Sequence, residues 1–130
     1  MAYVFDSTAA LALFLDEPGA DQVIGLLDRI EAGRSELLLP FMTFMEVRYR
    51  LLRIGEDEAA TGIEVMQAWR ATTFESTPAW GAAAARLKAR GGLSLADAWI
   101  ASLALLHDAQ LVHSDPEFDR VEGLRSYPLR

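Results

Sequence analysis

Short apolar runs alternate with segments of helical period along the whole chain, and this alternation restricts the possible folds more than any other feature of the sequence. The expected strands are Tyr3–Phe5, Leu37–Leu39, Thr72–Glu75, Gln110–His113 and Leu124–Tyr127. Strands separated by helices can pair in parallel, and a parallel sheet is covered by helices on both faces. We therefore expect an α/β fold with three layers, α/β/α, around a mostly parallel sheet of four or five strands.

The segments between these strands begin and end at residues that favour helix starts and stops. Pro78, for example, suits the first turn of a helix. The expected helices are Ser7–Leu15, Ala20–Ala32, Thr43–Ile54, Asp57–Trp69, Pro78–Arg90 and Leu95–Leu106. A chain of 130 residues with no internal repeat and no linker fits one domain, which we place at residues 1–130.

The composition excludes several kinds of chemistry. Hydrophobic residues make up 52% of the chain and charged residues 24%, which is an ordinary globular balance. The absence of cysteine excludes disulfides, thiolate-bound zinc, iron–sulfur clusters and cysteine nucleophiles. The apolar stretch Ala9–Leu15 is too short to span a bilayer and has no basic segment before it, so we expect a cytoplasmic protein without a membrane partner.

The net charge of −7 is opposite to that of a general nucleic-acid-binding protein. It leaves room for an enzyme that holds a phosphodiester through a metal ion and a few arginines, because guanidinium groups bind phosphate in a bidentate manner. Lys88 is the only lysine among 12 lysine and arginine residues, so arginine dominates the positive charge. The acidic surplus also favours a basic partner protein.

Four isolated carboxylates stand in or directly after apolar stretches: Asp6, Glu46, Asp97 and Asp115. Moving an ionised carboxylate out of water costs several kcal/mol unless another group compensates for it. Asp6 and Asp115 each follow an expected strand, where ligands bind in open parallel sheets. All four acids can converge on that edge, and a shared cation would compensate for their burial. Oxygen ligands favour Mg²⁺ or Mn²⁺.

Each carboxylate also has a purely structural explanation. The spacing in Thr43–Glu46 and in Ser94–Asp97 matches that of a capping box. Asp6 and Asp115 precede segments whose first amides they could cap. The glutamate could instead form an ion pair with Arg50 one helical turn later. None of these explanations accounts for the apolar surroundings of all four acids.

The acids belong to a larger pattern. Val4–Ala9 surrounds the first acid, Ser94–Ala101 surrounds the third, and Leu111–Asp119 surrounds the fourth, with Glu46 alone between them. In order, spacing and length this pattern resembles the PIN-domain ribonucleases, specifically the VapC-type toxins of bacterial toxin–antitoxin pairs. The resemblance covers essentially the whole chain. Its most specific parts are the Ser-x-x-Asp-Ala helix and the terminal Asp-x-x-Phe segment.

The resemblance implies that Asp6, Glu46, Asp97 and Asp115 are catalytic and bind Mg²⁺ or Mn²⁺. It also implies hydrolysis of phosphodiester bonds in RNA, homodimerisation, and inhibition by a small cognate antitoxin of VapB type. Four residues beside the acids could support them: Ser7, Ser114, His113 and Asp119. Asp119 could also act as a fifth ligand.

One departure from the family pattern is His113, which stands where the family often has threonine or serine. A histidine there could orient an acid or a water molecule, or it could simply pack at the end of the strand. Asp119 could equally be a solvated turn residue.

Two other functions stay open at this stage. Asp6 and the spacing from Asp115 to Asp119 loosely resemble metal-dependent phosphatases of haloacid-dehalogenase type, although Thr8 stands where that family has a second aspartate. The chain could also be a catalytically silent PIN-fold interaction module. Apolar residues in Thr43–Ile54 and Asp57–Trp69 favour a helical hairpin that supports dimer or antitoxin contacts, with core packing as the alternative.

Overall fold

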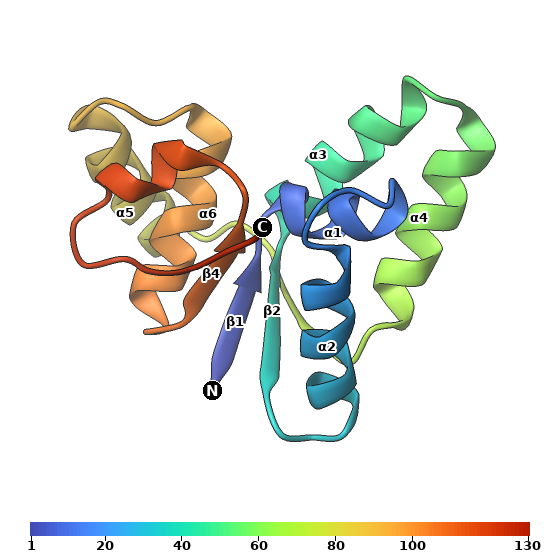
Figure 1. The fold of residues 1–130 in the computed structure, drawn as a ribbon. Coiled ribbons are helices and arrows are strands. Elements are labelled where there is room, and N and C mark those ends of the chain that lie inside the picture. The colour runs from blue at the N-terminus through green and yellow to red at the C-terminus, as the bar shows by residue number, and fades with distance from the viewer.

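Five parallel strands form one sheet, in the order β3-β2-β1-β4-β5 (Figure 1). A computed structural model describes residues 1–130. The strands are β1 (Ala2–Phe5), β2 (Glu36–Pro40), β3 (Thr72–Phe74), β4 (Gln110–His113) and β5 (Arg125–Pro128). The predicted α/β class and parallel sheet are therefore confirmed, with five strands.

Helices cover both faces of this sheet. They are α1 (Ser7–Phe14), α2 (Ala20–Glu31), α3 (Phe41–Leu52), α4 (Glu56–Ala68), α5 (Pro78–Ala89) and α6 (Leu95–Leu106), with a 3₁₀ helix η1 (Pro116–Arg120). In Figure 1, α5 and α6 lie on one side of the strands, and α1 to α4 lie on the other. None of the helices is long and apolar enough to cross a membrane.

The core explains why β1 lies at the centre of the sheet. Its side chains alternate between two buried clusters, as the pleat of a strand requires. Val4 packs in one cluster with Ile100 of α6, whereas Tyr3 and Phe5 pack in the other with Ile30 of α2. A third buried cluster joins α1 to the hairpin of α3 and α4. A strand buried on both faces is apolar throughout, as this one is.

The carboxyl ends of β1 and β4 lie side by side. Phe5 pairs with Val112, and the amide of Asp6 donates a hydrogen bond of 3.1 Å to the Val112 carbonyl. The chain first builds the sheet outward from β1 through β2 and β3, and then crosses to the other side of β1 to form β4 and β5. This reversal creates a topological switch point, which is where α/β sheets bind ligands.

The start of α3 differs from the prediction. The helix begins at Phe41 after Pro40, without a side-chain cap, so Thr43 lies inside it. The buried Thr43 hydroxyl donates a hydrogen bond of 2.7 Å to the Phe5 carbonyl. The capping-box explanation for Thr43–Glu46 is therefore wrong. Thr43 instead fastens α3 to the end of β1, and this contact brings Glu46 close to Asp6.

Candidate metal centre

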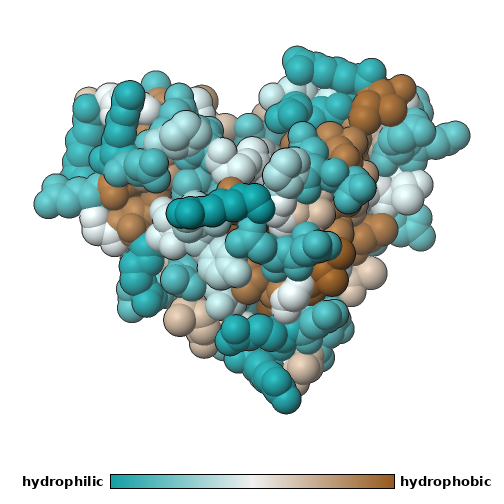
Figure 2. Space-filling view, viewed as in Figure 1, coloured by the Kyte–Doolittle hydropathy of each residue, from teal (hydrophilic) through white to brown (hydrophobic).

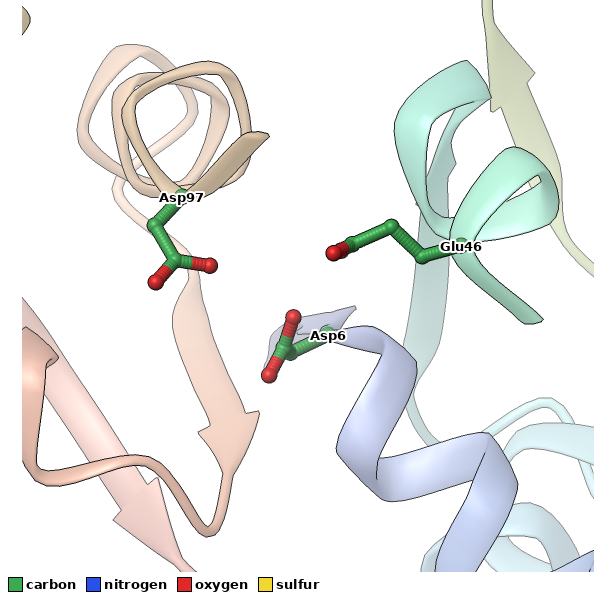
Figure 3. Close-up of side chains that lie close together, drawn as sticks. All are labelled: Asp6, Glu46 and Asp97. Carbon is green, nitrogen blue, oxygen red and sulfur yellow. The ribbon is translucent and has the colours of Figure 1, made fainter. Parts of the chain in front are cut away.

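Three carboxylates from three separate elements point toward one another at the switch point (Figure 3). Asp6 stands between β1 and α1, Glu46 lies in the second turn of α3, and Asp97 lies in the first turn of α6. Each residue contributes one carboxylate oxygen to a set of three oxygens that all lie within 4.8 Å of one another. Asp6 is 2% exposed and Asp97 is 6% exposed, so two of the acids are buried.

The fourth predicted acid belongs to a second group that shares Asp97 with the first. Asp97, Asp115 and Glu117 each place one carboxylate oxygen within 4.8 Å of the others. Asp115 directly precedes η1, and Glu117 lies in the first turn of that short helix. Glu117 was not among the predicted site residues. The signal that could have found it is its position two residues after Asp115, at the start of a turn led by Pro116.

Burial and mutual repulsion disfavour the charged forms of the acids. Burial is the main cause that raises the pKa of Asp6 to about 6, with a further contribution from the charge of Asp115. The hydroxyl of Thr8, followed by the amides of Ser7 and Thr8, acts in the opposite direction. Neighbouring charges and desolvation are the expected causes of such shifts, and an added cation would reverse them.

The other two acids of the first group show larger shifts. Burial, followed by the charge of Asp6, raises the pKa of Glu46 to about 7, while the nearby Ser7 hydroxyl and the Arg50 charge lower it. Burial, followed by contact with the Glu117 side chain, raises the pKa of Asp97 to about 8. The charges of Asp6, Asp115 and Glu46 add to the Asp97 shift.

Two oxygens of the group lack a hydrogen-bond partner. Asp6 Oδ1 and Glu46 Oε1 are buried and accept no hydrogen bond from the protein. Most buried polar atoms in folded proteins have a partner, and one without a partner destabilises the fold. A cation placed among the three carboxylates would bind these oxygens. The set consists only of carboxylate oxygens, so the residues fit Mg²⁺ or Mn²⁺.

The capping explanations hold for part of the site only. Asp6 occupies the capping position of α1, but its side chain accepts no capping hydrogen bond. Ser94 does cap α6, because its Oγ accepts the Asp97 amide at 3.1 Å. Asp115 Oδ1 accepts the Glu117 amide at 2.9 Å and therefore caps η1. No ion pair joins Glu46 to Arg50 within 4.0 Å, since the protein's one such pair joins Arg125 to Asp108.

The predicted supporting residues occupy different environments. Ser7 is buried beside Glu46. Ser114 is exposed, and it is its backbone amide rather than its hydroxyl that donates a hydrogen bond, to Thr8. Asp119 is exposed and lies outside both acidic groups. His113 is buried at the end of β4.

Thr8, which was not among the predicted site residues, connects the two carboxylate-bearing loops. Its hydroxyl donates to Asp6 Oδ2 at 2.8 Å, and its Oγ1 accepts the Ser114 amide at 3.0 Å. The loop after β1 is thereby tied to the loop after β4. Its place two residues after Asp6 is the only sequence signal for this role.

Comparisons with known proteins identify the family of this fold. A sequence model of the PIN domain matches residues 3–124. No protein matches in the curated set. The solved structure of VapBC2 from Rickettsia felis bound to a DNA fragment from its promoter contains a similar chain, with 18% identity, full coverage of both chains and a TM-score of 0.77.

Two further solved structures contain a similar chain. DNA-bound VapBC from Salmonella typhimurium gives 16% identity, 98% coverage of both chains and a TM-score of 0.78. VapC20 from Mycobacterium tuberculosis, described as a Sarcin-Ricin loop cleaving toxin, gives 15% identity, 90% and 92% coverage, and a TM-score of 0.67. At such identities the structures establish a shared fold. Together with the sequence match over residues 3–124, they show that this chain belongs to the PIN domain family.

Proposed function

We propose that this protein is a divalent-metal-dependent endoribonuclease, the toxin of a type II toxin–antitoxin system. The observation that carries the proposal is the convergence of Asp6, Glu46 and Asp97 from three elements, with two buried oxygens that accept no hydrogen bond. The PIN family match and the likeness to VapC20 support an RNA-cleaving rather than a general hydrolytic role.

In this proposal, Asp6, Glu46, Asp97 and Asp115 would hold Mg²⁺ or Mn²⁺, and Glu117 would join them. When bound, the metal would lower the pKa of a water molecule and would stabilise negative charge on the phosphoryl oxygens. The protein orients the carboxylates: Thr8 holds Asp6, and Thr43 holds the helix that carries Glu46. Ser94 caps the helix that carries Asp97.

Arginine side chains supply candidate contacts to the RNA backbone. All of those proposed are exposed and lack an acidic partner within 4.0 Å. Figure 2 shows a notch in the surface between the lobe of α5 and α6 and the lobe of α3 and α4, and the strand ends that carry the acids open toward it. A phosphate backbone in this notch could reach arginines on both lobes. They are Arg48, Arg50, Arg53, Arg86 and Arg90.

An apolar groove on the hairpin of α3 and α4 is the proposed binding surface for a VapB-type antitoxin. The groove has a volume of about 360 Å³, and Asp57 and Glu58 lie among its lining residues. Its apolar lining is Phe14, Leu15, Leu51, Ile54 and Val65. The R. felis and S. typhimurium structures are VapBC complexes, which supports a protein occupant. An amphipathic helix with basic residues would complement both the apolar lining and the acidic rim.

We also propose that the protein forms a homodimer and acts in the cytoplasm.

The decisive experiment compares RNA with a phosphate monoester as substrate. Purified protein should cleave single-stranded RNA with Mg²⁺ or Mn²⁺, and EDTA should stop the reaction. Asp97→Asn should remove cleavage, whereas Asp119→Asn should retain it because Asp119 lies outside both acidic groups. Hydrolysis of the monoester without RNA cleavage would favour a phosphatase, and Mn²⁺ binding without either activity would favour a silent interaction module.

A further inference from the structure

His113 lies buried directly behind the second acidic group. It is the last residue of β4 and is 2% exposed. Its ring packs edge-on against Phe118 of η1, with 4.8 Å between the ring centroids.

The imidazole makes one specific hydrogen bond. His113 Nδ1 accepts the backbone amide of Asp115 at 3.1 Å. Because Nδ1 accepts a hydrogen bond it carries no proton, so the ring proton is on Nε2. Nε2 is buried and has no hydrogen-bond partner. As a space-filling group the imidazole is therefore a poor choice, because a buried N–H without an acceptor destabilises the folded state.

The bond to Asp115 is one of two that hold consecutive amides of the loop after β4. The Ser114 amide donates to Thr8 Oγ1, and the Asp115 amide donates to His113 Nδ1. With its backbone held, Asp115 can turn its carboxylate to accept the Glu117 amide. The same loop thereby places Asp115 and Glu117 beside Asp97.

We infer that His113 is a positioning residue: by accepting the Asp115 amide, its Nδ1 holds the carboxylates of Asp115 and Glu117 beside Asp97 in a geometry that binds a divalent cation. The inference rests on the proposed metal-dependent function. This role requires only one acceptor atom placed opposite the Asp115 amide. The imidazole supplies that atom, Nδ1, and its ring also packs against Phe118.

Two amide substitutions separate this role from simple packing. In His113→Asn, Oδ1 can occupy the place of Nδ1 and accept the Asp115 amide. In His113→Gln, Oε1 lies near the place of Nε2 and cannot make the same bond. His113→Leu supplies a third variant, which has no acceptor but retains apolar volume. All three can be titrated with Mn²⁺ by calorimetry and melted in metal-free buffer.

The expected pattern is that the His113→Asn variant keeps the Mn²⁺ affinity within about threefold, whereas the Gln and Leu variants lose on the order of tenfold or more, as when a metal ligand loses its supporting hydrogen bond. Without metal, the Leu variant should stay folded and melt close to the wild type, since it removes the unpaired Nε2–H but leaves the Asp115 amide without its acceptor. Rates of RNA cleavage at a fixed subsaturating Mn²⁺ concentration should follow the affinities.

Several results would overturn the inference. Unchanged Mn²⁺ affinity in both the Gln and Leu variants would show that the acceptor is not needed, and equal losses in the Asn and Gln variants would show that only the ring's packing matters. Nitrogen NMR of the His113 ring must also show the Nε2-protonated tautomer. A wild type that binds Mn²⁺ but leaves RNA intact would contradict the proposed function and not the role of His113. A wild type that binds no Mn²⁺ would contradict both.

Discussion

Replacing Asp6 with asparagine should stabilise the metal-free protein at pH 7.5. The carboxylate is buried, one of its oxygens accepts no hydrogen bond, and its pKa rises from an ordinary value of 3.8 to about 6. A rise of that size corresponds to about 3 kcal/mol of unfavourable free energy for the ionised form. Asparagine has nearly the same volume, and its carbonyl can still accept the Thr8 hydroxyl, so most of this penalty should disappear.

The pH dependence follows from the direction of this shift. A carboxyl whose pKa is higher in the folded state stabilises that state only while it is protonated. For Asp6 this contribution is complete below pH 3.8 and is lost as the pH rises through about 6. The advantage of the asparagine variant should therefore be largest above pH 6 and should vanish toward pH 4, where the wild-type side chain is protonated too.

The assay is thermal melting of chelator-treated wild type and Asp6→Asn protein from pH 4 to pH 8, with Asp119→Asn as an exposed control. For a domain of this size, about 3 kcal/mol corresponds to a rise in Tm of roughly 10 °C, and a rise of several degrees is expected. Saturating Mn²⁺ should narrow the difference. At a hundredfold excess over Kd, the wild type gains about 2.7 kcal/mol, and the variant, which lacks a ligand charge, gains less.

A capping role for Asp6 makes the opposite prediction. Asparagine caps a helix about as well as aspartate, and loss of the negative charge at the helix start costs up to about 1 kcal/mol, so the variant would melt at or below the wild type in metal-free buffer at every pH at which Asp6 is ionised. That result, combined with an unchanged melting temperature of the wild type on addition of Mn²⁺, would refute the argument from buried, unpaired carboxylates.

Three further outcomes are expected. Asp97→Asn should lower RNA cleavage by at least about a hundredfold while the circular dichroism spectrum stays native, since the pKa of Asp97 is about 8 and its metal-free form is already largely protonated at pH 7; an unfolded variant would instead indicate a structural role. Mn²⁺ affinity, measured by calorimetry, should fall as the pH drops from 8 to 6, because protons compete for carboxylates whose pKa values are raised; a flat profile would contradict the raised values. Expression of the protein should arrest growth, and a small protein encoded beside its gene should relieve the arrest. Ile54→Asp, in the apolar groove, should prevent this relief while RNA cleavage is retained. Ile24→Asp, at another exposed position on α2, should leave the relief intact.

Local patterns in the sequence determined most of the secondary structure. The helix Leu95–Leu106 and the strand Gln110–His113 were predicted with the bounds that the structure shows. Such elements depend on side-chain periodicity and on neighbours within a few residues, which a sequence displays directly. The positions of Asp6 and Asp115 after strands were equally local features.

Only the tertiary structure decided which groups meet. Thr43 looked like a helix cap because its spacing to Glu46 fits one, yet α3 begins two residues earlier and the hydroxyl bonds to Phe5, 38 positions away. Thr8 meets Ser114 across 106 positions, and Glu117 meets Asp97 through the conformation of a short loop. These contacts depend on the strand order around β1, which is set by how two buried clusters pack on opposite faces of the sheet rather than by any local sequence signal.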